Sequence, residues 1–391
     1  MLEAGESRVT SLYVHVPFCA QKCAYCAFYS EPSGGDLINR YVGALVREME
    51  LVAYDLRPAT IFFGGGTPSL LNLRQWEELL RAMGRLNLLG ADEFTIECNP
   101  ATVSAEKARL LREYGVNRIS MGVQSLDEAL LDRLGRVHTR DMVFRSFDTL
   151  RQAGFDNLNL DLMFAIPGQT LEVWRATLRE ATALGSEHLS SYEVIYEDDT
   201  PLFAQMKAGE FDVNEDLACA MYDELLEHAR HAAFEQYEIA NFARHKSPNR
   251  PLGEDIPSHA CRHNVNYWRG GEFYGLGPSA TGLVRGIRTK NWSNTQLYCE
   301  QLERGQRAIE SREVLPPLAR AGETAAFGLR MVAGWPFDTF RRTTGQDLRE
   351  GWAADMDALV QKGWASRTPD VFRLTRHGLR FADAAAEMFL R

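Results

Sequence analysis

The sequence lacks any run of about 18 consecutive apolar residues, the length that a helix needs to cross a bilayer. Residues 1–8 also lack the apolar core of a secretory signal. Cysteine is scarce, with seven among 391 residues, and this scarcity excludes a disulfide framework. We therefore expect a protein of a reducing compartment, the cytoplasm, without a transmembrane segment. Contact with a membrane surface stays open.

Basic residues are outnumbered by acidic ones, 43 Lys and Arg against 53 Asp and Glu, which gives a formal net charge of −10. This balance disfavours a broad surface for phosphate groups, so we expect no nucleic acid as a partner. The rest of the composition is ordinary for a globular protein, with 45% hydrophobic and 25% charged residues. A chain of this length is expected to form two or three domains.

Short β-branched runs alternate with helical patterns over the first 243 residues. Strand followed by helix, repeated about six times, predicts a parallel sheet with helices outside it. The pattern alone does not separate an open sheet from a barrel. The predicted strands are 12–17, 59–63, 93–98, 117–122, 158–163 and 188–194, and the predicted helices are 36–54, 73–84, 104–114, 140–153, 170–184 and 214–231.

The remaining third of the chain has a different pattern. Residues 244–260 hold three prolines among polar residues and predict a surface loop. Beyond residue 313 the pattern is helical, then hairpin-like at 364–374, which predicts a winged-helix-like C-terminal domain. Such a domain can bind DNA, but the acidic balance favours a packing or partner domain. The predicted domains are therefore 1–243, a connecting segment 244–312, and 313–391.

Three cysteines close to the N-terminus are spaced C-x3-C-x2-C, at Cys19, Cys23 and Cys26. Three thiolates on one loop can bind three irons of a cubic [4Fe–4S] cluster and leave the fourth iron open. The alternative is a zinc loop, but zinc sites generally pair two C-x2-C knuckles, and the sequence has no second one.

Polar residues follow the predicted strands. Gly64–Gly66 and Thr67 allow the backbone to approach a ligand closely, and Glu97 can accept hydrogen bonds from ribose hydroxyls. Arg136 suits a carboxylate, because a guanidinium binds one through two parallel hydrogen bonds. Each signal alone is also explained by a strand-to-helix turn or a surface charge. Function in parallel barrels gathers at the carboxyl ends of strands, where these residues are expected to lie.

The cysteine triad and these strand ends, in this order, resemble the radical S-adenosylmethionine (SAM) superfamily. The resemblance covers nearly the whole chain and implies a partial (β/α)6 barrel with a smaller C-terminal helical domain. It implies a [4Fe–4S] cluster on Cys19, Cys23 and Cys26, with SAM on the open iron. It places the following residues against SAM or beside the cluster: Tyr13, Tyr25, Gly65, Gly66, Thr67, Glu97, Gln124, Arg136 and Asp161.

Within the superfamily, the motifs resemble the branch of oxygen-independent coproporphyrinogen III dehydrogenase and its haem-chaperone relatives. The dehydrogenase carries a long arm before its cysteines, whereas only 18 residues precede Cys19 here. It also carries a further cysteine two positions after the third, where this sequence has Phe28. One departure from the family pattern is Ala27, where an aspartate is usual. The first two features favour the chaperone, and the departure at Ala27 removes no cluster ligand.

The stretch from His263 to Trp268 matches the H-N-x-x-Y-W signature of the chaperones. A neutral imidazole can ligate haem iron, so the resemblance makes His263 a candidate haem ligand. The alternative is a polar–aromatic turn that closes the bottom of the barrel. Cys261 is a second candidate ligand, although a lone buried cysteine is the simpler interpretation.

The sequence therefore predicts a haem chaperone rather than an oxidoreductase, with haem, a haem-acceptor apoprotein and an electron donor for the cluster as partners. The alternative is the dehydrogenase, which oxidatively decarboxylates coproporphyrinogen III in porphyrin biosynthesis. A tRNA-modifying enzyme is a third class, and the sequence has no basic strip that would support it.

Overall fold

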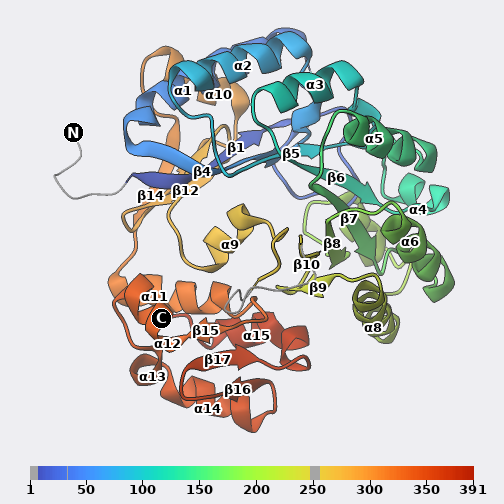
Figure 1. Cartoon of the computed structure of the whole chain (residues 1–391), viewed down its shortest axis with the longest axis vertical. Coiled ribbons are helices and arrows are strands. Elements are labelled where there is room, and N and C mark those ends of the chain that lie inside the picture. The colour runs from blue at the N-terminus through green and yellow to red at the C-terminus, as the bar shows by residue number, and fades with distance from the viewer. Residues whose placement is uncertain (1–7, 33, 247–255) are drawn as a thin grey trace.

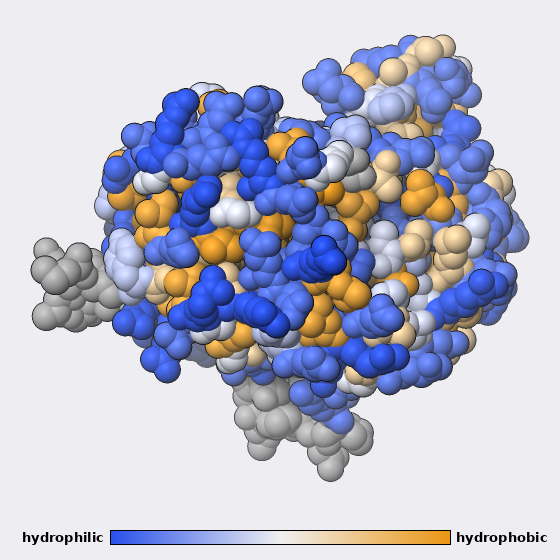
Figure 2. Space-filling model, turned by 90° about the horizontal axis from the view of Figure 1, so that it is seen from above, coloured by the Kyte–Doolittle hydropathy of each residue, from blue (hydrophilic) through white to orange (hydrophobic). Residues whose placement is uncertain are grey.

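The computed structural model describes residues 8–32, 34–246 and 256–391 (Figure 1). Part of the predicted loop 244–260 and nearly all of the segment 1–8 lie outside these residues. No helix among the described residues is long and apolar enough to cross a membrane. On the face seen in Figure 2, hydrophilic residues cover most of the surface and hydrophobic residues show between them.

A nine-stranded sheet forms the larger part of the molecule, in the order β11-β1-β4-β5-β6-β7-β8-β10-β9. The strands from β11 to β8 run parallel, and β10 and β9 are antiparallel additions at one edge. The strands are β1 Val9–Val16, β4 Leu56–Gly65, β5 Glu93–Cys98, β6 Arg118–Gln124, β7 Leu158–Phe164, β8 His188–Glu193, β9 Glu235–Gln236, β10 Asn241–Ala243 and β11 Tyr274–Leu276.

Helices cover the outer face of this curved sheet (Figure 1). The bounds agree with the predicted ones to within two residues, because polar N-caps mark the helix starts: Asn72 with Gln75 forms a capping box, and Ser104 and Thr139 cap the next helices. The predicted α/β class and partial barrel are confirmed. The helices are α1 Gly35–Val52, α2 Leu73–Arg85, α3 Ala105–Glu113, α4 Glu128–Arg133, α5 Arg140–Gln152, α6 Leu171–Ala183, α7 Pro201–Lys207 and α8 Glu215–His231.

The strands are buried on both faces, as expected for a parallel sheet covered by helices. Phe63 packs against Trp76 of α2 and Phe94 of β5, with ring centroids 5.2 and 5.8 Å apart. This core holds the strands in register, so that their carboxyl ends meet at one rim.

Helix α9, Arg262–Trp268, lies at the opposite end of the barrel, between it and the C-terminal part (Figure 1). The buried carboxylate of Glu93 accepts the backbone N–H groups of Arg262 and His263, at 2.9 and 3.0 Å. A carboxylate there satisfies free N–H groups at the helix start. Helix α10, Thr295–Glu303, packs against α1, and β12 Thr281–Val284, β13 Ile287–Asn291 and β14 Ile309–Val314 form a three-stranded antiparallel sheet.

The C-terminal part has its own core, in which Trp335, Phe340, Trp352 and Phe372 are buried. Its helices and small antiparallel sheet, in the order β15-β17-β16, form the predicted winged-helix-like arrangement. The boundaries proposed at 243/244 and 312/313 stay predictions. The elements are α11 Pro317–Gly328, β15 Trp335–Pro336, α12 Phe337–Thr344, α13 Leu348–Gly351, α14 Ala353–Gln361, β16 Ala365–Arg367, β17 Val371–Leu374 and α15 Ala382–Glu387.

Candidate functional site

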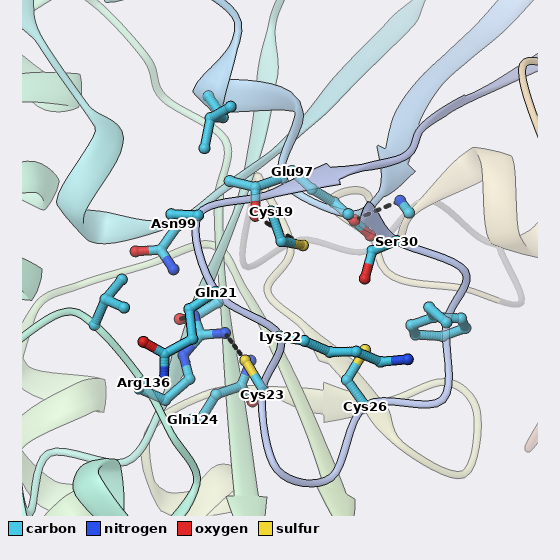
Figure 3. A pocket seen from close by; sticks show the side chains of 18 of the residues that line it. Cys19, Gln21, Lys22, Cys23, Cys26, Ser30, Glu97, Asn99, Gln124 and Arg136 are labelled. Atoms are coloured by element: carbon cyan, nitrogen blue, oxygen red, sulfur yellow. Dashed lines mark hydrogen bonds between the residues drawn. The ribbon is translucent and has the colours of Figure 1, made fainter. Parts of the chain in front are cut away.

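The three clustered cysteines lie on one loop at the carboxyl rim of the barrel and line one pocket (Figure 3). Cys19 ends the short strand β2, Phe18–Cys19, which pairs with β3, Glu31–Pro32. Between Cys23 and Cys26, the backbone of Ala24 donates to the carbonyl of Leu134 and accepts from the N–H of Leu202, both at 2.9 Å. The loop is therefore fixed to two other segments of the rim.

The three thiols are free, and they are not gathered around one point. Within the described ranges, no group of three His, Cys, Asp or Glu side chains is arranged to hold a single metal ion. A zinc site needs its ligands around one ion, whereas each thiolate of a cubic cluster binds a different iron. Three free thiols on one loop fit such a cluster.

Two hydrogen-bond donors face the thiols. The Arg136 guanidinium donates to Cys23 Sγ at 3.4 Å, and the Thr67 hydroxyl donates to Cys19 Sγ at 3.6 Å. Burial raises the pKa of the Cys26 thiol. Donors beside sulfur stabilise the thiolate that iron requires, so these contacts fit a thiolate-bound cluster.

The glycine-rich turn after β4 is attached to the cysteine loop by backbone hydrogen bonds. Gly66 N–H donates to Val16 O at 2.8 Å, and Thr67 N–H donates to Phe18 O at 2.7 Å. A Cβ on Gly66 would lie 2.7 Å from Phe18 O, and Gly65 has φ +102°. Only glycine tolerates both the close approach and the left-handed backbone, so this turn fixes one wall of the pocket.

Two carboxylates lie side by side in the pocket. Glu97, at the end of β5, accepts the backbone N–H of Gly65 at 3.2 Å, and Asp161 on β7 accepts Asn159 Nδ2 at 2.7 Å and the Ser120 hydroxyl at 3.2 Å. Burial, and then the negative charge of Asp161, raises the pKa of Glu97 to about 8. The Glu97 carboxyl therefore keeps its proton more readily, and a cationic ligand such as a sulfonium would favour its charged form.

The opposite wall is formed by Arg136, Gln124 and two tyrosines, Tyr25 and Tyr192. The Arg136 guanidinium donates to Gly122 O at 2.6 Å, while its Nε is buried without a partner. Tyr192 donates to Gln124 Oε1 at 2.9 Å. An unfilled guanidinium donor beside the cysteines is available for a ligand carboxylate.

The structure brings all of the predicted site residues to this pocket except Tyr13 and His263. The side chain of Tyr13 points within the barrel, where its hydroxyl bonds to His15 Nδ1 at 3.0 Å. The sequence reasoning missed Asn99, Ser120 and Tyr192, which also line the pocket. Each of these lies in the second half of a predicted strand or directly after it. This position is the only feature of the sequence that could have indicated a place at the pocket.

The geometry argues against His263 as a haem ligand. Its imidazole is 1% exposed and both nitrogens are engaged: Nδ1 lies 3.0 Å from Thr60 Oγ1 and 3.1 Å from Ser11 Oγ, and Nε2 lies 2.7 Å from Tyr267 Oη. The ring also stacks on Phe62. The alternative interpretation, a turn that closes the barrel bottom, describes this arrangement. Cys261 is buried in the same way and bonds to Glu93.

A partial parallel barrel, with a cysteine triad and a polar pocket at its carboxyl rim, defines the radical SAM class. The family model "Radical SAM superfamily" matches residues 13–181, and "HemN C-terminal domain" matches 315–381. The solved structure of coproporphyrinogen III oxidase (HemN) from Escherichia coli superposes with a TM-score of 0.82 over 98% of this chain and 90% of its own, at 21% identity, which shows the shared fold.

Curated relatives identify the family more closely. Heme chaperone HemW of Bacillus subtilis is 33% identical over 97% of this chain and 99% of its own length, and that of Lactococcus lactis is 31% identical over 97% of both. Heme chaperone HemW of Escherichia coli is 33% identical over 97% of this chain and 98% of its own. The chain belongs to the HemW family of radical SAM proteins.

Proposed function

We propose that the rim pocket holds a [4Fe–4S] cluster and SAM, as the superfamily implies. Cys19, Cys23 and Cys26 would hold the cluster through three of its irons, and the fourth iron would be open to SAM. The free cysteine thiols, the donors that face them and the unpartnered Arg136 Nε fit these two groups.

The protein's own residues hold SAM in place. Arg136 binds the methionyl carboxylate, and Glu97 accepts the ribose hydroxyls. A sulfonium beside Glu97 and Asp161 would favour the charged forms of these two carboxyls. The residues proposed to contact SAM are Tyr25, Gly65, Gly66, Thr67, Glu97, Gln124, Arg136 and Asp161. When reduced, the cluster supplies an electron to SAM.

Two single substitutions test this assignment. Arg136→Ala and Glu97→Ala should each weaken SAM binding by roughly 1–3 kcal/mol, because each removes a hydrogen bond to a charged or polar ligand group. SAM titration of the reconstituted protein measures this, and iron content checks that the cluster survives. Arg140→Ala, an exposed arginine on α5 that pairs with Glu180, is the control. Unchanged SAM affinity in both pocket variants would reject the assignment.

We further propose that the protein binds haem and delivers it to a haem-requiring acceptor protein, in a reducing compartment such as the cytoplasm. The observation that carries this proposal is the full-length similarity to relatives named heme chaperone HemW. An electron donor for the cluster is implied as a further partner. The alternative, coproporphyrinogen III dehydrogenase, has the shared fold in its favour. Phe28, at the position of the dehydrogenase's further cysteine, is 69% exposed and counts against it.

One sample can separate the two functions. Anaerobically reconstituted protein should bind haem, with a Soret band distinct from that of free haem. Supplied with SAM and a reductant, it should not convert coproporphyrinogen III, because Phe28 stands where the dehydrogenase has its further cysteine. Absorbance titration and product analysis measure the two outcomes. Sustained turnover without haem binding would promote the dehydrogenase instead.

A further inference from the structure

An apolar cavity of about 670 Å³ lies between helix α9 and the C-terminal part, apart from the cluster pocket, with which it shares no lining residue. Helix α9 contributes one wall, α11 and α15 contribute the others, and β12 and β13 close one side. Figure 1 shows α9 between the barrel and α11. The volume falls in the range of small-molecule sites, about 300–1,000 Å³.

Aromatic rings line this cavity. Trp268 of α9 faces Phe327 of α11, with ring centroids 6.2 Å apart and planes inclined by 34°. Phe273 packs against Tyr267 on the same side. Phe327 is 51% exposed although it is large and apolar. Two aromatic rings at an open cavity offer flat surfaces to a planar ligand.

Three arginines surround the rings, and two are only loosely paired. Arg320 lies 3.6 Å from Glu272, and Arg330 lies 3.5 Å from Glu238 and 3.9 Å from Asp383. These distances exceed the 2.7–2.9 Å of strong charge-assisted hydrogen bonds. Arg288 is held more tightly, by Glu313 and Glu323.

Two further donors at this cavity have no hydrogen-bond partner among the residues that the structure describes. Arg330 stacks over Trp268, its guanidinium carbon 4.9 Å from the ring centroid, and its Nε is buried without a hydrogen-bond acceptor. The indole Nε1 of Trp268 is likewise buried without one. Buried donors are nearly always satisfied, so these two are available to a ligand's acceptor groups. The cavity thus combines flat apolar walls with two unsatisfied donors, one of them on a guanidinium.

Resting on the proposed function, we infer that this cavity seats haem through its porphyrin ring and its two carboxylates, and not through its iron. The ring lies against Trp268 and Phe327, and the propionates bind Arg320 and Arg330. The residues that line the cavity in the described part of the chain include no histidine, cysteine or methionine. Tyr267 lines it too, but its hydroxyl is hydrogen-bonded to the buried His263.

The absence of an iron ligand among these lining residues has a direct consequence. Recognition by ring and carboxylates does not distinguish haem from the metal-free porphyrin. Protoporphyrin IX should therefore bind with an affinity within about threefold of that of haem, and the two should compete for one site. A site that uses an axial ligand would strongly prefer haem, because the metal-free ring cannot form that bond.

The experiment titrates the full-length protein with hemin and, separately, with protoporphyrin IX, following absorbance and quenching of tryptophan fluorescence. Phe327→Ala and Arg320→Gln should each raise the dissociation constant of both ligands about tenfold, because each removes one aromatic or charged contact. The matched controls are Tyr54→Ala, an exposed aromatic on another face, and Arg304→Gln after α10. Both controls should bind like the wild type.

Both cavity variants should fold, since Phe327 and Arg320 are partly exposed, and thermal unfolding checks this. Hemin binding that is unaffected by both substitutions, or that excludes protoporphyrin IX, would overturn the cavity assignment and leave the chaperone function standing. Hemin that does not bind the wild type at all would overturn the chaperone function as well. The two failures are therefore distinguishable.

Discussion

Replacing Cys23 with alanine should abolish the reduced-cluster electron paramagnetic resonance signal and most of the bound iron. Each thiolate of the triad binds its own iron, so the loss of one leaves two irons of the cubic cluster without protein ligands. Reconstituted wild-type protein should carry about four irons and four sulfides per chain. Iron and sulfide analysis with spectroscopy measures both. SAM binding that depends on the open iron should be lost together with the cluster.

The controls use cysteines outside the triad. Cys219→Ala, at an exposed position on α8, should leave the cluster unchanged. Cys98→Ala is the more demanding control, because this thiol lines the same pocket. Burial raises the pKa of Cys98 to about 11, so it stays a neutral thiol and a poor ligand. Full cluster loading in Cys23→Ala, or its loss in Cys98→Ala, would contradict the assignment of three ligands.

The rim pocket was predictable because its residues follow strands, and parallel strands bring their carboxyl ends to one edge. Glu97, Gln124 and Asp161 lie far apart in the sequence, and the resemblance to the radical SAM superfamily places all three against the same ligand. The spacing of Cys19, Cys23 and Cys26 is local and needed no tertiary information. Asn99 and Tyr192 were missed because a polar residue near the end of a strand does not by itself indicate a binding site.

The other end of the barrel was not predictable in the same way. His263 is buried because it meets Ser11 and Thr60, which are 252 and 203 residues away in the chain. The aromatic cavity depends on the packing of α9 against α11 and α15, and no periodicity reports how such distant helices dock. A motif such as H-N-x-x-Y-W indicates that its residues have a structural or functional role. It does not indicate which of them face a ligand and which face the core.

Because His263 is buried, we expect its replacement to affect the stability of the protein and not its haem binding. His263→Ala should lower the free energy of unfolding by roughly 2–4 kcal/mol, because it leaves a cavity beside Phe62 and removes the partner of the Tyr267 hydroxyl. Any folded fraction should still bind hemin with the wild-type Soret band. Denaturant unfolding and hemin titration measure the two effects. His245→Ala, at a partly exposed histidine that pairs with Glu235, is the control. A lost Soret band with unchanged stability would restore the axial-ligand interpretation.

The pH dependence of stability gives an independent test of the same burial. Burial, and then the positive charge of Arg118, lowers the pKa of His263 to about 3, whereas an unfolded histidine titrates near 6.5. Below pH 6.5 the unfolded chain takes up a proton that the folded protein refuses, so folding stability is complete above that pH and falls as the pH drops toward 3. The pKa of buried His188 is lowered as well, again by burial first, and this adds to the slope of stability against pH.

In His263→Ala the part of this slope that is due to His263 should vanish, leaving a shallower loss of stability between pH 6.5 and 3. Denaturant unfolding of both proteins across this range measures the difference. Parallel curves would mean that His263 is protonated in the folded state, as a solvent-exposed imidazole would be.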